Sequence, residues 1–251
     1  MIAPDPIAFS IFGLDVLWYG VLIGIGFILA IGLSYHRAPK IGVDQDFLLT
    51  LTIWIVPAAL IGARAYYVLF NWDSYAGDIF KILNIRAGGL AVHGGLILCF
   101  IVGYFLCKYY DEHFLNVCDL VAPAIPLAQA IGRWGNFFNE EAHGYATDLP
   151  WAQIINGVGY HPTFLYESVW CFLLFLFLMW FSSNKRRFQG QVICLYGILY
   201  SVERFFVESF RTDSLMIGPL RQAQVISLVI IIGCAILYLY LRKHGKEIYK
   251  I

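Results

Sequence analysis

The sequence predicts an all-α polytopic membrane protein with about seven transmembrane helices and a small extracytoplasmic loop region. Two features of composition indicate this class: 60% of the 251 residues are hydrophobic, and only 14% are charged. In ordinary soluble domains roughly a quarter of the residues are charged. The third observation is that the apolar residues collect into runs approaching the roughly 20 residues that cross a bilayer as a helix. A water-soluble globular domain is therefore excluded.

The apolar runs give the expected transmembrane helices in chain order. They are residues 17–35, 47–70, 90–109, 115–131, 164–181, 192–207 and 225–241. The longest interruption is 132–162, so the runs leave little room for a soluble domain. We therefore expect residues 1–251 to form a single transmembrane catalytic domain.

The basic residues predict the orientation of these helices, since Lys and Arg gather in cytoplasmic loops. They follow the odd-numbered helices: His36, Arg37 and Lys40, then Lys108, then Lys185, Arg186 and Arg187, and finally Arg242, Lys243, Lys246 and Lys250. Each odd-numbered helix therefore ends inside. This places the amino terminus outside and the carboxyl terminus in the cytoplasm, with segments 71–89, 132–162 and 210–220 facing outward.

Several unusual polar residues lie at one depth in this arrangement. Near the outer ends of separate predicted helices are Tyr19, His93, Arg133, Asn136, His161, Arg204 and Glu208. Stray polar side chains that reach for the membrane surface would occur on both sides. The one-sided grouping favours a shared site in the outer half of the membrane.

The most informative stretch is 132–144, which sets charged and amide side chains among aromatic ones. Arg133 offers the planar guanidinium that grips a phosphate through two parallel hydrogen bonds. Asn136 and Asn139 add neutral donors, and Glu141 is suited to orienting an arginine. The alternative is an interfacial loop that satisfies its own charges.

Arg204, Glu208 and Arg211 recur at the spacing that places them on one helical face. An arginine near the bilayer centre costs roughly 2.5 to 3.5 kcal/mol on insertion scales, so Arg204 needs a partner. Either it forms a structural pair with Glu208, or the pair also holds an anion. Arg64 lies inside the second predicted helix and should meet a carboxylate, a carbonyl or a lipid head group.

Two further side chains have a functional and a structural interpretation. His93 stands between glycine pairs, where a ligand approaches closely and imidazole moves protons near neutral pH; a packing histidine is the alternative. Tyr19 is either a ligand contact or an interfacial belt residue. The six cysteines lack the paired spacing of metal ligands, so we expect no metal and no cofactor.

Five motifs appear in order along the chain. They are Trp18-Tyr19-Gly20, His93-Gly94-Gly95, the stretch 132–141, the stretch 161–167 and the stretch 203–208. Together they resemble the prolipoprotein diacylglyceryl transferases of bacteria over nearly the whole chain. The resemblance implies an enzyme that moves diacylglycerol from phosphatidylglycerol to the lipobox cysteine of a preprolipoprotein. A thioether forms, and sn-glycerol 1-phosphate is released.

The resemblance also implies a location, partners and site residues. The location is the bacterial cytoplasmic (inner) membrane, crossed several times, with the active site toward the outer leaflet. The partners are phosphatidylglycerol, lipobox peptides and the lipid bilayer, with no nucleic acid and no metal. We assign catalysis to His93, Arg133 and Arg204. We assign substrate binding to Tyr19, Arg64, Asn136, Asn139, Glu141, Gly144 and Glu208, of which Gly144 enters only through the resemblance.

One departure from the family pattern concerns Glu140. Many members read Asn-Gly-Glu where this chain reads Asn139-Glu140-Glu141, so the role of the extra charge stays open.

Two rival functions belong to other classes. A transporter for an anionic solute would line its pathway with Arg64, Arg133 and Arg204, but it would need polar groups through the full depth of the membrane. A lipid-binding subunit would use the same outer cluster without chemistry.

Overall fold

The computed structural model describes residues 1–85, 88–212, 216–246 and 248, which are mostly helical. By its internal contacts the chain divides into two compact units. The larger unit comprises Met1–Ser34 and Cys118–Ile251, and the smaller unit is Tyr35–Val117. The all-α class is confirmed, while the single catalytic domain stays a prediction.

Each apolar run forms helix. The long helices are α1 (Trp18–Ile41), α2 (Gln45–Phe70), α4 (Val92–Tyr109), α7 (Thr163–Asn184), α8 (Gln191–Glu208) and α9 (Gln222–His244), and the fourth run forms α5 (Phe114–Val121) and α6 (Ala124–Phe138). Among the described residues, five helices are long and apolar enough to cross a membrane, or six if α5 and α6 form one bent span. The protein is a multi-pass membrane protein. Helix α8 is not among the five because it carries Glu203, Arg204 and Glu208.

The fourth run differs from the prediction at both ends. It bends by 41° between α5 and α6, where Pro123 precedes the second helix. Proline lacks an N–H group and disfavours helical backbone in the residue before it, which accounts for the break. At its other end α6 continues to Phe138. Arg133 and Asn136 are therefore helical, and the sequence-based placement of these residues past the end of the helix was wrong.

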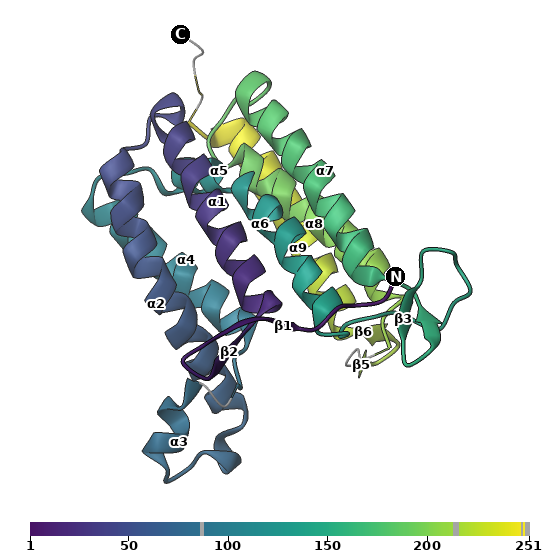
Figure 1. The fold of residues 1–251 in the computed structure, drawn as a ribbon. Coiled ribbons are helices and arrows are strands. Elements are labelled where there is room, and N and C mark those ends of the chain that lie inside the picture. The colour runs from purple at the N-terminus through teal and green to yellow at the C-terminus, as the bar shows by residue number, and fades with distance from the viewer. Residues whose placement is uncertain (86–87, 213–215, 247, 249–251) are drawn as a thin grey trace. The chain divides into compact units, whose positions relative to one another are not determined.

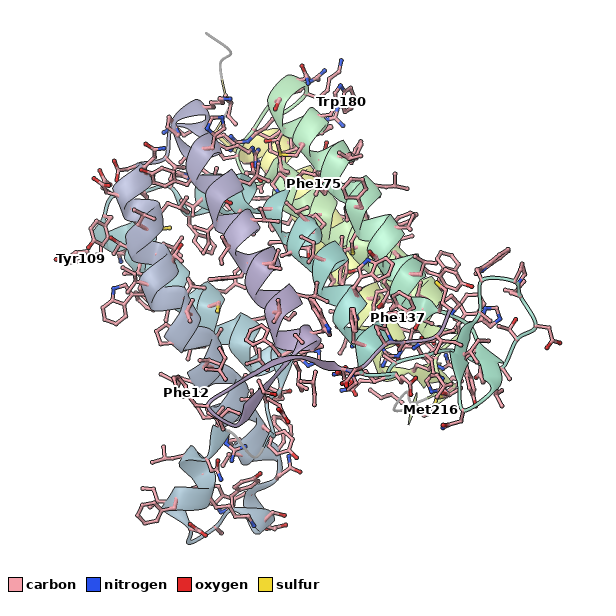
Figure 2. All side chains as sticks on the ribbon, viewed as in Figure 1. Phe12, Tyr109, Phe137, Phe175, Trp180 and Met216 are labelled. Atoms are coloured by element: carbon pink, nitrogen blue, oxygen red, sulfur yellow. The ribbon has the colours of Figure 1, made fainter. Side chains whose placement is uncertain are left out.

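In the larger unit, α6 packs against α7, α7 against α8, and α8 against α9 (Figure 1). Part of the core between them is formed by Ala122, Leu174, Leu178 and Val192. The outer face of α7 carries exposed apolar side chains, such as Trp180, which projects away from the helix (Figure 2). A large exposed apolar surface of this kind suits contact with lipid rather than water.

A buried carboxylate fixes the beginning of α8. Asp119 is fully buried and accepts a hydrogen bond from Nε of Arg186 at 2.9 Å. It also accepts from the backbone N–H groups of Gly190, Val192 and Ile193 at 2.8 to 2.9 Å. The first N–H groups of a helix have no partner within it, so a carboxylate there satisfies them and favours the positive end of the helix dipole. Asp119 thus sets the position of the helix that carries Arg204.

Three short antiparallel hairpins lie outside the helices. They pair β1 (Ile7–Ile11) with β2 (Leu14–Leu17), β3 (Gln153–Ile155) with β4 (Val158–Tyr160), and β5 (Met216–Ile217) with β6 (Leu220–Arg221). All three belong to the larger unit. The second falls in the expected outward loop.

In the smaller unit, α2 and α4 pack closely along their glycines. A Cβ atom on Gly94 would lie 2.3 Å from the carbonyl oxygen of Gly62, so neither position has room for a side chain. The link between the two helices holds a 3₁₀ turn (Trp72–Ser74) and α3 (Ile79–Leu83).

The basic residues stand at the ends that the sequence assigns to the cytoplasm. Lys40 lies in the last turn of α1, Lys108 in that of α4, and Arg242 and Lys243 in that of α9. Lys250 lies outside the described residues. The orientation itself stays a prediction.

Candidate active site

Four side chains from three helices of the larger unit form a connected network of ion pairs, here called the arginine cluster: Arg133, Glu167, Arg204 and Glu208. Glu167 Oε2 lies 2.9 Å from Arg133 Nη1, and Glu167 Oε1 lies 2.5 Å from Arg204 Nη1. Arg204 Nη2 lies 2.6 Å from Glu208 Oε2. A single carboxylate therefore holds both guanidinium groups in a fixed relation.

The carboxylate side chains of the cluster are more deeply buried than its arginine side chains. The Glu167 and Glu208 side chains are 2% and 5% exposed, whereas those of Arg133 and Arg204 are 21% and 20% exposed. A guanidinium has five N–H donors, and each η nitrogen carries two of them. Since the η nitrogens of Arg204 each meet one carboxylate oxygen, this partly exposed group keeps donors that have no partner in the described part of the chain. The cluster can accept an anion without first breaking its own pairs.

Arg133 has a neutral partner as well. Its Nη2 donates to the hydroxyl of Tyr200 on α8 at 3.4 Å. Arg133 is thus tied to α7 through Glu167 and to α8 through Tyr200.

Sequence reasoning missed the central role of Glu167. The residue closes the motif 161–167, of which only His161 was singled out from the sequence. A usable signal existed, because a carboxylate inside an apolar helix is costly and marks a partner or a function.

Sequence reasoning also missed Glu203. This residue is 4% exposed, and neither of its carboxylate oxygens has a hydrogen-bond partner among the described residues. It precedes Arg204 directly on α8.

The two asparagines of the stretch 132–144 donate hydrogen bonds to one carboxylate, that of Glu141. Asn136 Nδ2 donates to Glu141 Oε1 at 2.9 Å, and Asn139 Nδ2 donates to the same oxygen at 3.2 Å. Glu141 thus organises the two asparagines, and its orienting of an arginine stays a prediction. By contrast, Glu208 contacts Arg204 directly.

The turn that follows α6 explains the position of Glu140. Its φ is 52°, and that of Ala142 is 59°, so both adopt the left-handed backbone that glycine tolerates best. The Glu140 side chain is exposed. A pocket of about 670 Å³ lies beside the turn and is lined by Ala3, Pro4, Asp5, Pro6, Leu17, Phe138, Asn139, Glu140 and Glu141.

Tyr19 and Gly144 occupy close-packed positions. Tyr19, 39% exposed at the start of α1, lies against Gly135, where a Cβ would be 2.5 Å from the Tyr19 ring. Gly144 donates its N–H to the carbonyl of His161 at 2.9 Å. A Cβ there would lie 2.7 Å from His161 Cβ and 2.9 Å from the carbonyl oxygen of Phe210. Only glycine fits where the outer loop crosses these two segments.

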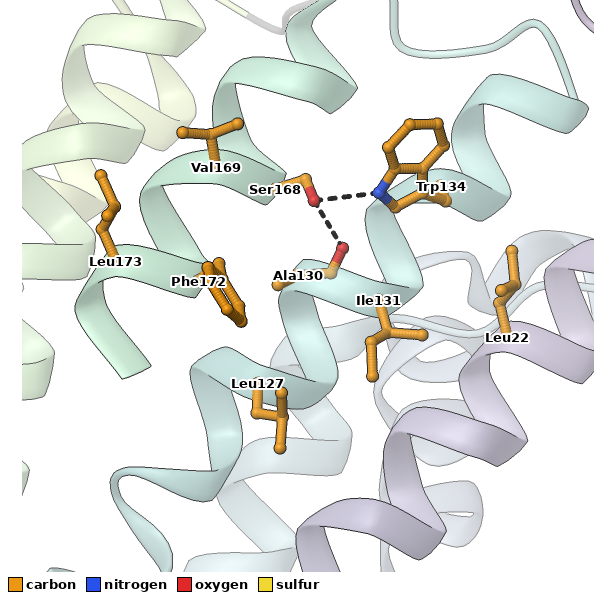
Figure 3. Close-up of a pocket in the computed structure, with 9 residues that line it drawn as sticks. All are labelled: Leu22, Leu127, Ala130, Ile131, Trp134, Ser168, Val169, Phe172 and Leu173. Atoms are coloured by element: carbon orange, nitrogen blue, oxygen red, sulfur yellow. Dashed lines mark hydrogen bonds between the residues drawn. The ribbon is translucent and has the colours of Figure 1, made fainter. Parts of the chain in front are cut away.

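An apolar pocket of about 500 Å³ lies in the larger unit (Figure 3). It is lined by Leu22, Leu127, Ala130, Ile131, Trp134, Ser168, Val169, Phe172 and Leu173. Trp134 Nε1 donates to Ser168 Oγ at 3.1 Å, and Ser168 Oγ donates to the carbonyl of Ala130 at 2.8 Å. Two of the lining residues are sequence neighbours of the arginine cluster, since Trp134 follows Arg133 and Ser168 follows Glu167.

Arg64 and His93 belong to the smaller unit, whereas the arginine cluster is built wholly from the larger one. Arg64 is 6% exposed and donates to four backbone carbonyls at 2.7 to 3.0 Å, those of Lys81, Ile82, Gly88 and Gly89. Its partner is therefore a set of carbonyls, one of the three kinds expected. His93 is exposed near the start of α4, with its ring centroid 6.4 Å from that of Tyr66. The functional roles of both residues stay predictions.

Comparisons with known proteins point to one family. The family model described as prolipoprotein diacylglyceryl transferase matches residues 6–240. A phosphatidylglycerol–prolipoprotein diacylglyceryl transferase of Clostridioides difficile (strain 630) is 51% identical, with 97% of this chain and 98% of the relative covered. Proteins with the same name from Finegoldia magna and Clostridium novyi are 49% and 47% identical, with 98% of this chain and 98% and 99% of the relatives covered.

Proposed function

Because the chain belongs to the prolipoprotein diacylglyceryl transferase family, we propose that it transfers the diacylglyceryl group of phosphatidylglycerol to a lipobox cysteine of preprolipoproteins. The observation that carries the mechanism is the arginine cluster, in which one buried carboxylate fixes two partly exposed guanidinium groups. The transporter and lipid-binding alternatives are not favoured, since the relatives are named as transferases.

The reaction makes one bond and breaks one. The cysteine thiol loses its proton, and the sulfur attacks the glyceryl carbon next to the phosphate. The C–O bond to phosphate breaks, and its electron pair stays on the departing oxygen. Fixed donors aimed at that oxygen stabilise the transition state most effectively. Arg133 and Arg204 supply such donors, and sn-glycerol 1-phosphate leaves.

The thiol proton needs an acceptor, because the thiolate is the nucleophile and a free cysteine has a pKa of roughly 8.5. We assign this step to His93, whose imidazole is suited to proton transfer near neutral pH. A folded His93→Gln enzyme that keeps the full rate across pH would remove the assignment.

The lipid donor has a polar head group and apolar acyl chains, and the larger unit offers a polar and an apolar surface to match them. The apolar pocket beside Trp134 suits one acyl chain, since its lining is mostly apolar and includes the residues that follow Arg133 and Glu167 in the chain. Tyr19, Asn136 and Asn139 hold the glycerol head group, with Glu141 aligning the two amides. Glu208 orients Arg204, and Gly144 shapes the loop beside the site. Beyond its four carbonyl bonds, Arg64 has one N–H without a partner among the described residues, and we assign this group to substrate binding.

The enzyme works in the bacterial cytoplasmic membrane, with its active site toward the outer leaflet. This proposal rests on the basic residues at the ends of α1, α4 and α9, which favour the cytoplasmic side. The amino terminus is then outside and the carboxyl terminus in the cytoplasm.

One assay tests the function against its rivals. Purified protein in vesicles receives phosphatidylglycerol and a lipobox peptide, and mass spectrometry follows the peptide while glycerol phosphate is measured in solution. We expect one diacylglyceryl group on the cysteine and an equal amount of glycerol phosphate. A peptide with serine in place of cysteine is the control. Anion flux without peptide modification would support a transporter, and lipid retention without either would support a binding subunit.

A further inference from the structure

Glu203 is a carboxyl group in an unusual environment. Its side chain is buried, and both oxygens lack a hydrogen-bond partner within the described part of the chain. Burying a carboxylate without compensation costs several kcal/mol or more, so native proteins rarely keep one without a role.

The charged and titratable groups that face Glu203 come from three helices. It lies within electrostatic range of Arg133 on α6, of Glu167 and Cys171 on α7, and of Arg204 on its own helix. Tyr200, one turn earlier on α8, accepts the hydrogen bond from Arg133. Glu203 therefore senses both arginines of the cluster without being bonded to either.

These surroundings act on Glu203 in opposite directions. Loss of water and the negative charge of Glu167 disfavour the ionised carboxylate, whereas Arg133 and Arg204 favour it. When large effects oppose each other in this way, a small change in the site decides which form is present. Binding an anion to the two arginines is such a change.

The protonation state of Glu203 affects how strongly the arginine cluster attracts an anion. Within the cluster, the charges of Arg133 and Arg204 are balanced by those of Glu167 and Glu208. A protonated Glu203 leaves this balance unchanged. An ionised Glu203 adds one negative charge beside the cluster, and the attraction of the two arginines for a phosphodiester falls.

We propose that Glu203 is a positioning residue that sets the charge of the arginine cluster, being protonated when the phosphodiester binds and ionised when the site releases its anion. This proposal rests on the proposed function, since it concerns the same phosphate. Glu203 acts through Arg133 and Arg204 and touches no substrate atom.

The test uses equilibrium binding of a short-chain phosphatidylglycerol to the purified enzyme, because this phosphodiester keeps one charge across the range examined. For the unchanged enzyme, affinity should fall about tenfold between about pH 6 and about pH 9. Glu203→Gln should bind tightly throughout that range and lose the dependence on pH. Glu203→Asp should restore the dependence.

Two further variants complete the design. Glu203→Met also removes the charge and leaves no polar atom to bury, so it should fold even if the glutamine variant does not, and it should bind independently of pH. Asp46→Asn removes an exposed carboxylate of α2 and should leave the unchanged enzyme's pH profile intact.

The outcomes separate two failures. A pH profile that persists in both Glu203→Gln and Glu203→Met, or that is absent from the unchanged enzyme, overturns the role of Glu203. Failure of the unchanged enzyme to modify a lipobox peptide overturns the proposed function instead, and it is read from the transfer assay rather than from binding.

Discussion

Replacing Glu167 with glutamine perturbs the cluster at its centre. The two oxygens of Glu167 reach Arg133 at 2.9 Å and Arg204 at 2.5 Å, so one substitution weakens both ion pairs. Glutamine has nearly the same shape but only one acceptor oxygen, and its NH₂ group faces a guanidinium that also donates. One of the two arginines must therefore turn away.

The size of the effect depends on the partners that each arginine keeps once its ion pair with Glu167 is weakened. Arg204 retains Glu208 at 2.6 Å, whereas among the described residues Arg133 retains only the Tyr200 hydroxyl at 3.4 Å. Arg133 should therefore be the group that loses its alignment. Removing one preorganised donor from a developing oxyanion costs about 10²- to 10³-fold in rate. We expect a loss of this size in kcat for Glu167→Gln.

The assay is the initial rate of transfer to a lipobox peptide in vesicles of fixed phosphatidylglycerol content. Thermal unfolding in the same detergent serves as the check on folding, and Asp46→Asn is the matched carboxylate-to-amide control on a different helix. A folded Glu167→Gln enzyme that keeps more than about a tenth of the rate would refute the shared-carboxylate mechanism.

Four further outcomes are expected. Arg133→Lys and Arg204→Lys should each lose most transfer activity despite keeping the charge, because an ammonium cannot form the bidentate pair; steady-state kinetics will check this. Glu140→Gly should keep its activity and unfold at a higher temperature, since a left-handed backbone costs a residue other than glycine roughly 1 kcal/mol. Gly144→Ala should lower activity, because the added Cβ meets His161 and Phe210 at 2.7 and 2.9 Å; near-normal transfer would contradict this packing. Asp119→Ala should destabilise the fold by about 3 to 5 kcal/mol, as expected when the partner of a buried charge is removed, and thermal unfolding will measure the loss.

The sequence was sufficient to locate the helices and to single out an arginine that needs a partner. Apolar runs identify helices because a span has to bury its backbone in lipid, and this constraint acts on each run separately. The cost of a guanidinium in the membrane likewise singled out Arg204 and its need for a partner. Both inferences depend on one segment at a time.

The partners of these residues could not be predicted in the same way. Whether Arg204 meets Glu208 alone or also Glu167 depends on how α7 and α8 rotate against each other, which no single segment encodes. The end of α6 was also misplaced, because the apolar run stops at residue 131 while the helix continues to Phe138. In the folded chain Gly135 is helical and leaves room for Tyr19.

The sharing of Glu167 resolves a conflict that any phosphate site in a membrane faces. An arginine there needs a carboxylate to offset the loss of water, yet it also needs N–H donors left over to bind the phosphate. With the two oxygens of Glu167 divided between Arg133 and Arg204, and with Glu208 against Arg204, both guanidinium groups are held in place while their side chains stay 21% and 20% exposed. A cluster with every donor paired would be stable but unable to bind its ligand, and an unpaired one would not fold.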